Sequence, residues 1–435
     1  MRNQLNLPSF SEQVCSNMAE SEASTPAKTR GNRLRQPHIL LGVTSPQTCL
    51  VLQGRLRALR EAGFRVSLIS APGELLHESA RNERAAAYTV PMERGISPIA
   101  DAIALFRIWR LLRHLKPDIV EFSTPKAGLL GSLAAWICRV PVRIYFLRGL
   151  KLETLRGLKR KLLQITERMA SASAHVVVCN SRSLRKEAMT LHIAPASKLV
   201  LLGEGSSNGV DLERFSPGPS RIRQQRGIPS DAFVVGFAGR LTNDKGLPEL
   251  LEAFTAILRQ EPRARLLLVG WFDAAEDALE VGLRARIEGH PSISCTGFVA
   301  DPAPYYRAMD LMVLPTWREG FPNVVLEAGA TGVPVIGTLC TGSRDAVIPE
   351  VTGMLIPPGC PEAICETVLQ LLHDRERRLR MGNAARAWVR ENYENRKVLG
   401  LTVDFYLGMI GPACAQKVEL DEKLPQPTTG LAVLP

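Results

Sequence analysis

The feature that most constrains the fold is an alternation of short, continuously apolar segments with longer helical ones. In the first half, strands are predicted over residues 38–43, 65–70, 118–123, 142–147, 175–180 and 198–205. Strands that are apolar on both faces are typical of parallel sheets covered by helices on two sides. Helical patterns lie between them, such as 51–63, which ends at a glycine suited to a helix C-terminus. This half is therefore predicted to form a doubly wound α/β domain.

The pattern is interrupted once and then restarts. Residues 214–231 are rich in Pro, Gly and Ser, which indicates a linker. Further predicted strands begin at residues 233, 265, 293, 311, 334 and 353. A chain of 435 residues is too long for one ordinary core. The predicted fold class is therefore α/β, with two Rossmann-like doubly wound domains facing each other across a ligand cleft.

Domain boundaries follow from these patterns. We expect a disordered tail over 1–36, an N-terminal domain over 37–213, the linker over 214–231, a C-terminal domain over 232–395, a helix over 396–410 that packs back on the first domain, and a disordered tail over 411–435. The first tail lacks the apolar core of a signal peptide. The longest apolar stretch, 127–138, is shorter than the roughly 20 residues of a membrane span. A buried helix is expected there.

Charge and cysteine content narrow the classes of function. The net charge of +11 indicates an anionic partner, which is a phosphate-rich ligand, nucleic acid or a membrane surface. No nucleic acid is expected, because no aromatic platform or recognised motif accompanies the charge. The nine cysteines include no C-x-x-C pair, which argues against a zinc site or a disulfide scaffold. The Walker pattern is absent. No G-x-G-x-x-G follows the first strand, which argues against a nicotinamide-dependent enzyme.

Two cations follow the first strand of the second half. Arg240 and Lys245 lie between Gly239 and Gly246, just before a helix that is predicted to begin near Pro248. Two cations beside the free amides of a helix start form a suitable seat for a pyrophosphate. The alternative is a solvated loop in which Lys245 pairs with Asp244.

Two glutamates lie eight positions apart after the predicted strand 311–316. Glu319 is on the loop that leaves the strand, and Glu327 is on the helix that Pro322 can start. Carboxylates accept hydrogen bonds from diols, so one glutamate could hold a ribose and the other a sugar. The alternative places an exposed Glu319 at the positive end of the helix dipole and Glu327 in a surface salt bridge.

Together these residues resemble retaining glycosyltransferases of the GT-B fold, family GT4 (group 1). The family's E-x7-E element corresponds to Glu319 and Glu327 within "EGFPNVVLEAGATGVPVI", and its GR…KG element corresponds to Gly239, Arg240, Lys245 and Gly246. The resemblance implies that Arg240 and Lys245 bind the donor diphosphate, Glu327 the nucleotide ribose, and Glu319 the donor sugar. It also implies that Phe321, Pro322 and Asn323 present backbone amides to the donor and that Gly239 contributes to donor binding.

The first half resembles a narrower branch that acts in bacterial polysaccharide or glycolipid assembly. The matching stretches are "TPKAGLLGSLAA", "YFLRGLKLET" and "GSSNGVDLERF", which begin at Thr124, Tyr145 and Gly205. The chain has Arg148-Gly149 where many relatives have His-Gly, so no role for a histidine carries over. Arg148 either contacts a phosphate of the donor or acceptor or is structural. The glycine-rich loop common after the first strand is replaced by residues 44–49.

The resemblance implies a glycosyltransferase that moves a hexose or N-acetylhexosamine from a nucleotide diphosphate sugar, with a UDP-sugar favoured. The implied acceptor is a hydroxyl of a lipid-linked or saccharide molecule, held by the N-terminal domain, and the anomeric configuration is retained. No cofactor or metal is expected, because the cations stabilise the leaving diphosphate and no D-x-D pair is present. A nucleotide-sugar 2-epimerase of the same fold and a non-catalytic sugar-nucleotide binding protein stay open as alternatives.

The last expectation concerns location. Residues 143–168 are basic and repeat leucine or isoleucine at Leu150, Leu152, Leu155, Leu158, Leu162, Leu163 and Ile165, with Arg156, Lys159, Arg160 and Lys161 elsewhere. A basic amphipathic helix can lie on an anionic membrane surface. The alternative is an ordinary domain helix whose leucines face the core. The predicted localisation is cytoplasmic and peripheral, at the inner face of the plasma membrane.

Overall fold

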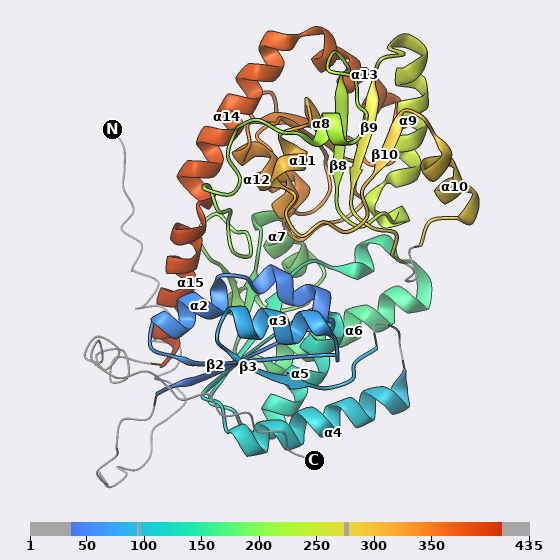
Figure 1. Cartoon of the computed structure of the whole chain (residues 1–435). Helices are drawn as coiled ribbons and strands as arrows, with labels where there is room; N and C mark the ends of the chain where they lie inside the picture. The colour runs from blue at the N-terminus through green and yellow to red at the C-terminus, as the bar shows by residue number, and fades with distance from the viewer. Residues whose placement is uncertain (1–35, 94, 96, 274–277, 411–435) are drawn as a thin grey trace, which may run out of the picture.

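Parallel strands form a seven-stranded sheet in the first half of the chain (Figure 1). The computed structural model describes residues 36–410 except 94, 96 and 274–277, so the tails predicted over 1–36 and 411–435 lie outside the described residues, Gln36 apart. The strand order is β3-β2-β1-β4-β5-β6-β7. The strands are β1 His38–Gly42, β2 Arg65–Ser70, β3 Ala86–Thr89, β4 Ile119–Ser123, β5 Val142–Leu147, β6 Val176–Cys179 and β7 Leu199–Leu201.

Helices cover both faces of this sheet, so successive residues of β1 are buried on opposite sides. Leu41 belongs to a core cluster with Leu56 of α2, whereas Leu40 belongs to a second cluster with Ile108 of α4 and Leu130 of α5. The helical elements of this half are η1 Pro46–Leu52, α2 Arg55–Glu61, α3 Glu74–Asn82, α4 Pro98–Leu115, α5 Pro125–Ile137, η2 Lys151–Thr154, α6 Gly157–Ser173, α7 Arg182–Thr190 and η3 Ala196–Lys198.

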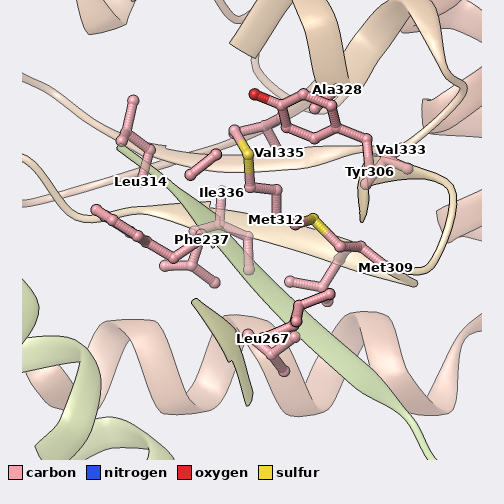
Figure 2. Packing of buried hydrophobic residues seen from close by; sticks show 14 of the residues in the cluster. Phe237, Leu267, Tyr306, Met309, Met312, Leu314, Ala328, Val333, Val335 and Ile336 are labelled. Atoms are coloured by element: carbon pink, nitrogen blue, oxygen red, sulfur yellow. The ribbon is translucent and has the colours of Figure 1, made fainter. Parts of the chain in front are cut away.

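A six-stranded parallel sheet with the order β10-β9-β8-β11-β12-β13 forms the second domain. The strands are β8 Val234–Ala238, β9 Arg265–Val269, β10 Ile293–Cys295, β11 Leu311–Leu314, β12 Val335–Thr338 and β13 Gly353–Ile356. The helical elements are α8 Ile222–Gln225, η4 Asn243–Lys245, α9 Leu247–Gln260, α10 Val281–Gly289, α11 Ala303–Tyr306, α12 Asn323–Ala330, η5 Ser343–Asp345, α13 Pro361–His373 and α14 Arg375–Tyr393. Figure 2 shows part of the core, in which Phe237, Leu267 and Met312 come from three strands. The predicted fold class, two doubly wound α/β domains, is confirmed.

The end of the described chain returns to the first domain. Helix α14 and the following α15, Asn395–Ile410, run from the second domain down to the first, as the red helices of Figure 1 show. Phe405, Tyr406 and Met409 of α15 are buried in the core cluster that holds Leu41 and Leu56. The first domain's core is therefore built from two distant parts of the sequence.

Three local expectations differ from the structure. The residues predicted as a linker, 214–231, include the short helix α8, and Phe215, Ile222 and Ile228 are buried in the core of the second domain. The segment is therefore packed on the second domain along part of its length. The helix predicted over 51–63 starts only at Arg55, after a 3-10 turn, and strand β3 had no counterpart in the prediction.

The basic segment over 143–168 is not one helix. Its first residues form β5, and Leu150 and Leu152 are buried in a core cluster before α6 begins at Gly157. On α6 itself, Leu158, Leu162, Ile165 and Met169 are exposed, so part of the predicted apolar face does meet solvent. Within residues 36–410 as described, no helix is both long and apolar enough to cross a membrane.

Candidate active site

A cleft of about 2000 Å³ lies between the two domains. Its wall includes residues that directly follow strands of both sheets: Thr124 after β4, Arg148 after β5, and Gly239 and Arg240 after β8. Ligands of doubly wound sheets bind beyond the carboxyl ends of the strands. The cleft therefore occupies the place where this fold is able to hold a ligand.

The turn from β8 to α9 supplies one cationic corner of the cleft. Gly246 has φ +73°, and a Cβ atom there would lie 2.0 Å from the carbonyl oxygen of Pro315, so the turn requires glycine at this position. Arg240 lines the cleft, and its Nη1 lies 3.0 Å from Asp273 Oδ2. Arg240 is thus a partly exposed cation held by a carboxylate.

A buried aspartate organises the loops around this corner. Asp244 accepts hydrogen bonds from Arg318 Nη2 at 2.8 Å and from the Thr242 hydroxyl at 2.6 Å, and its Oδ2 lies 3.7 Å from Arg240 Nη2. Burial alone raises the pKa of Asp244, but Arg318 and Lys245 outweigh it, so the pKa falls below its usual value. The carboxylate therefore stays charged and holds Arg240 and Arg318 together.

The Lys245–Asp244 pair considered from the sequence is wrong, because the ion pair of Lys245 is with Glu319. Both side chains are mostly buried, at 14% and 16% exposure, and neither contributes to the wall of the cleft. The structure thus brings together two of the predicted site residues from loops 74 positions apart, but it pairs them with each other. A diphosphate that contacts Lys245 would have to share it with Glu319.

Helix α12 begins where the sequence indicated. Pro322 caps its N-terminus with an extended backbone, and Asn323 is the first helical residue. Pro322 has no N–H and cannot present an amide to a ligand, so the expected role as an amide donor is wrong. Phe321 is buried, and its ring lies 5.3 Å from that of Tyr393. Asn323 lines the cleft, and its Oδ1 accepts a hydrogen bond from Ser206 of the first domain at 3.2 Å.

Glu327 reaches the cleft from the second turn of α12. Its Oε2 accepts a hydrogen bond from the hydroxyl of Tyr306 at 2.7 Å, and Tyr306 is buried. Burial raises the pKa of Glu327, although the Tyr306 hydrogen bond lowers it again. The surface salt bridge considered from the sequence is therefore wrong. Glu327 is a positioned carboxylate in the cleft wall, able to accept a ligand hydroxyl.

Arg148 lies on the first-domain side of the cleft, close to the loop that carries Glu319. A Cβ atom on Gly320 would lie 2.0 Å from the carbonyl oxygen of Arg148, so the two loops touch and glycine is needed at the contact. Arg148 Nη1 donates a hydrogen bond to the Ser207 hydroxyl at 2.7 Å. Burial lowers the pKa of Arg148 to about 10, so the guanidinium is cationic at neutral pH.

The first-domain wall combines apolar and cationic groups. The apolar members on α5 and around α6 are Leu129, Leu130, Leu155, Leu162 and Leu163, and the cationic ones are Lys126, Lys151 and Lys159. Such a wall can take an amphiphile that carries negative charge. Among the described residues, no group of three or more His, Cys, Asp or Glu is placed to hold a metal ion.

The sequence predictions missed four residues around the cleft: Asp244 as an organising group, Asp273, Tyr306 and Arg318. Asp244 and Arg318 were visible, since each neighbours a predicted residue, Lys245 and Glu319 respectively. No signal in the sequence pointed to Tyr306, which meets Glu327 only through the packing of α11 on α12.

Two family models match the chain, one over each domain. Residues 232–374 match "Glycosyl transferases group 1", and residues 51–205 match "Glycosyl transferase 4-like domain". The capsular polysaccharide biosynthesis glycosyltransferase CapM of Staphylococcus aureus is 33% identical over 355 residues, which cover 81% of this chain and 92% of CapM. The Escherichia coli UDP-Gal:alpha-D-GlcNAc-diphosphoundecaprenol alpha-1,3-galactosyltransferase is 26% identical, over 74% of this chain and 84% of its own.

Solved structures share the fold. HepE of Anabaena, in complex with UDP-glucose, superposes with a TM-score of 0.70 over 85% of this chain and 99% of its own, at 19% sequence identity. Sucrose-phosphate synthase of Thermosynechococcus elongatus gives a TM-score of 0.71 over 86% and 99%, at 20% identity. At such identities the likeness concerns the two-domain architecture alone.

Proposed function

The chain belongs to the group 1 glycosyltransferases, and on that premise we propose that it transfers a hexose or N-acetylhexosamine from a UDP-sugar to a hydroxyl of a lipid-linked or glycan acceptor, with retention at the anomeric carbon. That the chain is a glycosyltransferase that uses a nucleotide sugar follows from its family. The choice of UDP, the sugar, the acceptor and the stereochemistry are the proposed part.

The observation that carries the proposal is the shared cleft. Arg240 and Glu327 line it from the second domain, and an apolar and cationic wall lines it from the first. Arg240 suits a diphosphate and Glu327 suits the ribose diol, because guanidinium and carboxylate form charge-assisted hydrogen bonds with these groups. The UDP-linked donor is supported by the UDP-Gal named for the Escherichia coli relative.

In the proposed reaction the bond between the anomeric carbon and the diphosphate oxygen breaks, and a bond to the acceptor oxygen forms on the same face of the sugar. The acceptor proton passes to the departing diphosphate. Arg240 stabilises the negative charge that develops there, a task that a cation preorganised by Asp273 and Asp244 can perform, and Lys245 adds to it once its ion pair with Glu319 rearranges. We therefore propose that transfer needs no metal ion.

We propose a lipid-linked acceptor and a peripheral position at the cytoplasmic face of the plasma membrane. The leucines of the first-domain wall lead to α6, whose Leu158, Leu162 and Ile165 are exposed beside Lys159, Arg160 and Lys161. Exposed apolar and basic side chains on one helix favour contact with an anionic lipid surface. The diphosphoundecaprenol named for the Escherichia coli relative supports an acceptor of this class.

The test is product analysis. The purified chain is incubated with UDP-glucose, UDP-galactose, UDP-N-acetylglucosamine or GDP-mannose, with and without a membrane lipid extract and EDTA. Sugar appearing in the lipid fraction from a UDP-sugar, with EDTA present and an axial linkage by NMR, supports the proposal. An epimerised nucleotide sugar without acceptor would point to an isomerase, and release of sugar only from GDP-mannose would contradict the UDP assignment.

A further inference from the structure

A buried polar cluster ends at the cleft and is not explained by donor binding in the second domain. It consists of Arg55 of α2, Glu121 of β4, Tyr406 of α15, and Arg148 after β5. Glu121 Oε2 accepts hydrogen bonds from Arg55 Nη2, at 2.7 Å, and from the Tyr406 hydroxyl, and Glu121 Oε1 lies 3.9 Å from Arg148 Nη2. Arg55, Glu121 and Tyr406 are at most 2% exposed. The cluster thus ties the returning helix to the cleft residue Arg148.

This cluster carries an excess of positive charge. Two guanidinium groups face one carboxylate, and burial beside Glu121 raises the pKa of Tyr406, so its phenol stays neutral. Nε and Nη1 of Arg55 and Nε and Nη2 of Arg148 have no hydrogen-bond partner among the described residues. Buried charge that is not fully paired is costly to a folded protein. The ring of Phe146, which is 4.8 and 4.4 Å from the two guanidinium groups, offsets only part of that cost.

The cluster reaches the cleft through Arg148. Arg55 is closed off from solvent, whereas Arg148 is 12% exposed and lines the cleft opposite the loop that carries Glu319 and Gly320. An anionic group in the cleft at Arg148 would neutralise the cluster. Ser207 holds Nη1 and Glu121 faces Nη2, so the guanidinium has a fixed place from which to meet it.

We propose that Arg148 binds a phosphate group on the first-domain side of the cleft and that Tyr406, acting through Glu121, is its positioning residue. The inference rests on the proposed function, in which both the donor and a lipid-linked acceptor carry phosphate. The phosphate comes from one of these two sources. Tyr406 belongs to α15, so the proposal gives the returning helix a role in substrate binding as well as in stability.

The experiment compares probes that differ only in phosphate. Binding of UDP against uridine, and of geranyl diphosphate against geraniol, is measured by titration calorimetry for the wild type and for Arg148→Gln. Loss of one charge-assisted contact is expected to weaken UDP or geranyl diphosphate by about tenfold and to leave the phosphate-free partner within about twofold. Weaker binding of UDP by Arg148→Gln would show that Arg148 contacts a phosphate of the donor. Weaker binding of geranyl diphosphate would show that it contacts a phosphate of the acceptor.

The matched control is Arg182→Gln, which removes a first-domain cation that is 64% exposed, pairs with Glu204 and lies outside both the cluster and the cleft wall. This control should change neither the ratio of the affinities for UDP and uridine nor the ratio for geranyl diphosphate and geraniol. The inference would be overturned if Arg148→Gln bound both phosphate probes as tightly as the wild type does. It would also be overturned if the wild type bound UDP no better than uridine and did not bind geranyl diphosphate. Normal UDP binding with an unaffected Arg148→Gln would leave the proposed transferase function standing. If Arg148→Gln does not fold, Arg148→Lys, which keeps the charge but displaces it, should show a smaller loss in the same arm.

Tyr406→Phe tests the positioning role. It removes the hydroxyl that donates a hydrogen bond to Glu121 and keeps the ring. The same phosphate probe should therefore bind about threefold more weakly, while the affinity for its phosphate-free partner stays unchanged. A merely structural role would lower the melting temperature without changing the ratio of the two affinities. That result would overturn the role of Tyr406 and of α15.

Discussion

Glu327 and Glu319 occupy similar places in the sequence motif but different physical environments. Glu327 has a neutral hydrogen-bond donor, Tyr306, and lines the cleft, whereas Glu319 has a cationic partner, Lys245, and does not. The first is suited to hold a ligand already in this conformation. The second reaches a ligand only if its ion pair rearranges, so the two residues should respond differently to truncation.

Glu327→Ala is expected to weaken UDP binding by roughly ten- to a hundredfold, because charge-assisted hydrogen bonds worth about 1.5–3 kcal/mol are lost. Tyr306→Phe, which leaves the carboxylate of Glu327 in place without its partner, should weaken UDP binding less than Glu327→Ala does. Glu319→Ala should lower kcat more than UDP affinity. Calorimetry and steady-state kinetics measure both, and wild-type turnover in the folded glutamate variants would contradict the assignment.

Glu167 of α6 is a buried carboxylate outside the cleft whose ionisation should affect stability. Burial raises its pKa from 4.5 to about 7, against a hydrogen bond from the Tyr145 hydroxyl at 2.6 Å that lowers it. Between these two values the unfolded chain releases the proton that the folded chain retains. The free energy of unfolding should therefore fall as pH rises from about 4.5 to about 7.

The glutamine of Glu167→Gln cannot ionise. In this variant the free energy of unfolding should therefore lack the part of its decrease with pH that comes from Glu167. Urea unfolding at a series of pH values measures it. The control is Glu376→Gln, which removes a carboxylate that is 89% exposed and should keep the wild-type slope. An equal slope in wild type and Glu167→Gln would show that Glu167 is already ionised in the folded protein across this range.

Turns and helix starts position the cations of the second domain. Their contribution to diphosphate binding can be measured separately from nucleoside binding. Arg240→Ala should weaken UDP about tenfold and uridine by less than twofold, because its guanidinium is suited to the diphosphate. Arg263→Ala is a suitable control, since that arginine is 75% exposed and pairs with Asp231. Equal losses for UDP and uridine would show that Arg240 does not touch the diphosphate.

Helix α6 has a matched test for membrane contact. Changing Lys159, Arg160 and Lys161 to Gln should reduce sedimentation with anionic liposomes, since each cation near such a surface contributes about 1 kcal/mol. The matched control changes Arg375, Arg377 and Arg380 of α14, in the second domain, to Gln. A wild type that stays in the supernatant at low salt would favour an acceptor that is not membrane-bound.

The strands other than β3 were predictable because each is a continuous apolar run, whereas the boundaries of the helices and turns between them were less so. Strand β3, Ala86–Thr89, was missed because it lies at the sheet edge, is only partly buried and has a mixed composition. Within the site, Gly239, Arg240 and Glu327 could be found by their position after strands or on a helix. Tyr306 and the cluster around Glu121 could not, because they depend on contacts between distant segments such as β4 and α15.

Hydrogen bonds between the two domains hold the cleft at its observed width. Asp345 Oδ2 accepts from the backbone N–H and the hydroxyl of Ser183, at 2.7 and 2.5 Å, and the Ser183 hydroxyl accepts from the Gly342 N–H at 2.7 Å. Thr341 donates to Glu153 at 2.5 Å. These contacts join the start of α7 and η2 to the loop after β12, so they can resist separation of the domains.

Asp345→Ala should favour a more open arrangement and raise the radius of gyration in small-angle scattering when no nucleotide is present. UDP should restore part of the wild-type value if it bridges the two domains. Ser181→Ala is the control, because Ser181 caps α7 within the first domain and its loss costs about 1 kcal/mol of stability without breaking an interdomain contact. An unchanged radius of gyration in Asp345→Ala would show that other contacts set the width.

The return of α15 to the first domain also affects the order in which the protein can fold during synthesis. The sheet of the first domain is complete at β7, yet Phe405, Tyr406 and Met409, which cover its core, emerge from the ribosome much later. At about 5–20 residues per second, the roughly 200 residues between them take about 10–40 s. During that interval Leu41 and Leu56 lack part of their apolar cover, and Glu121 lacks one of its donors. The nascent first domain is therefore expected to be a chaperone client until α15 has been synthesised.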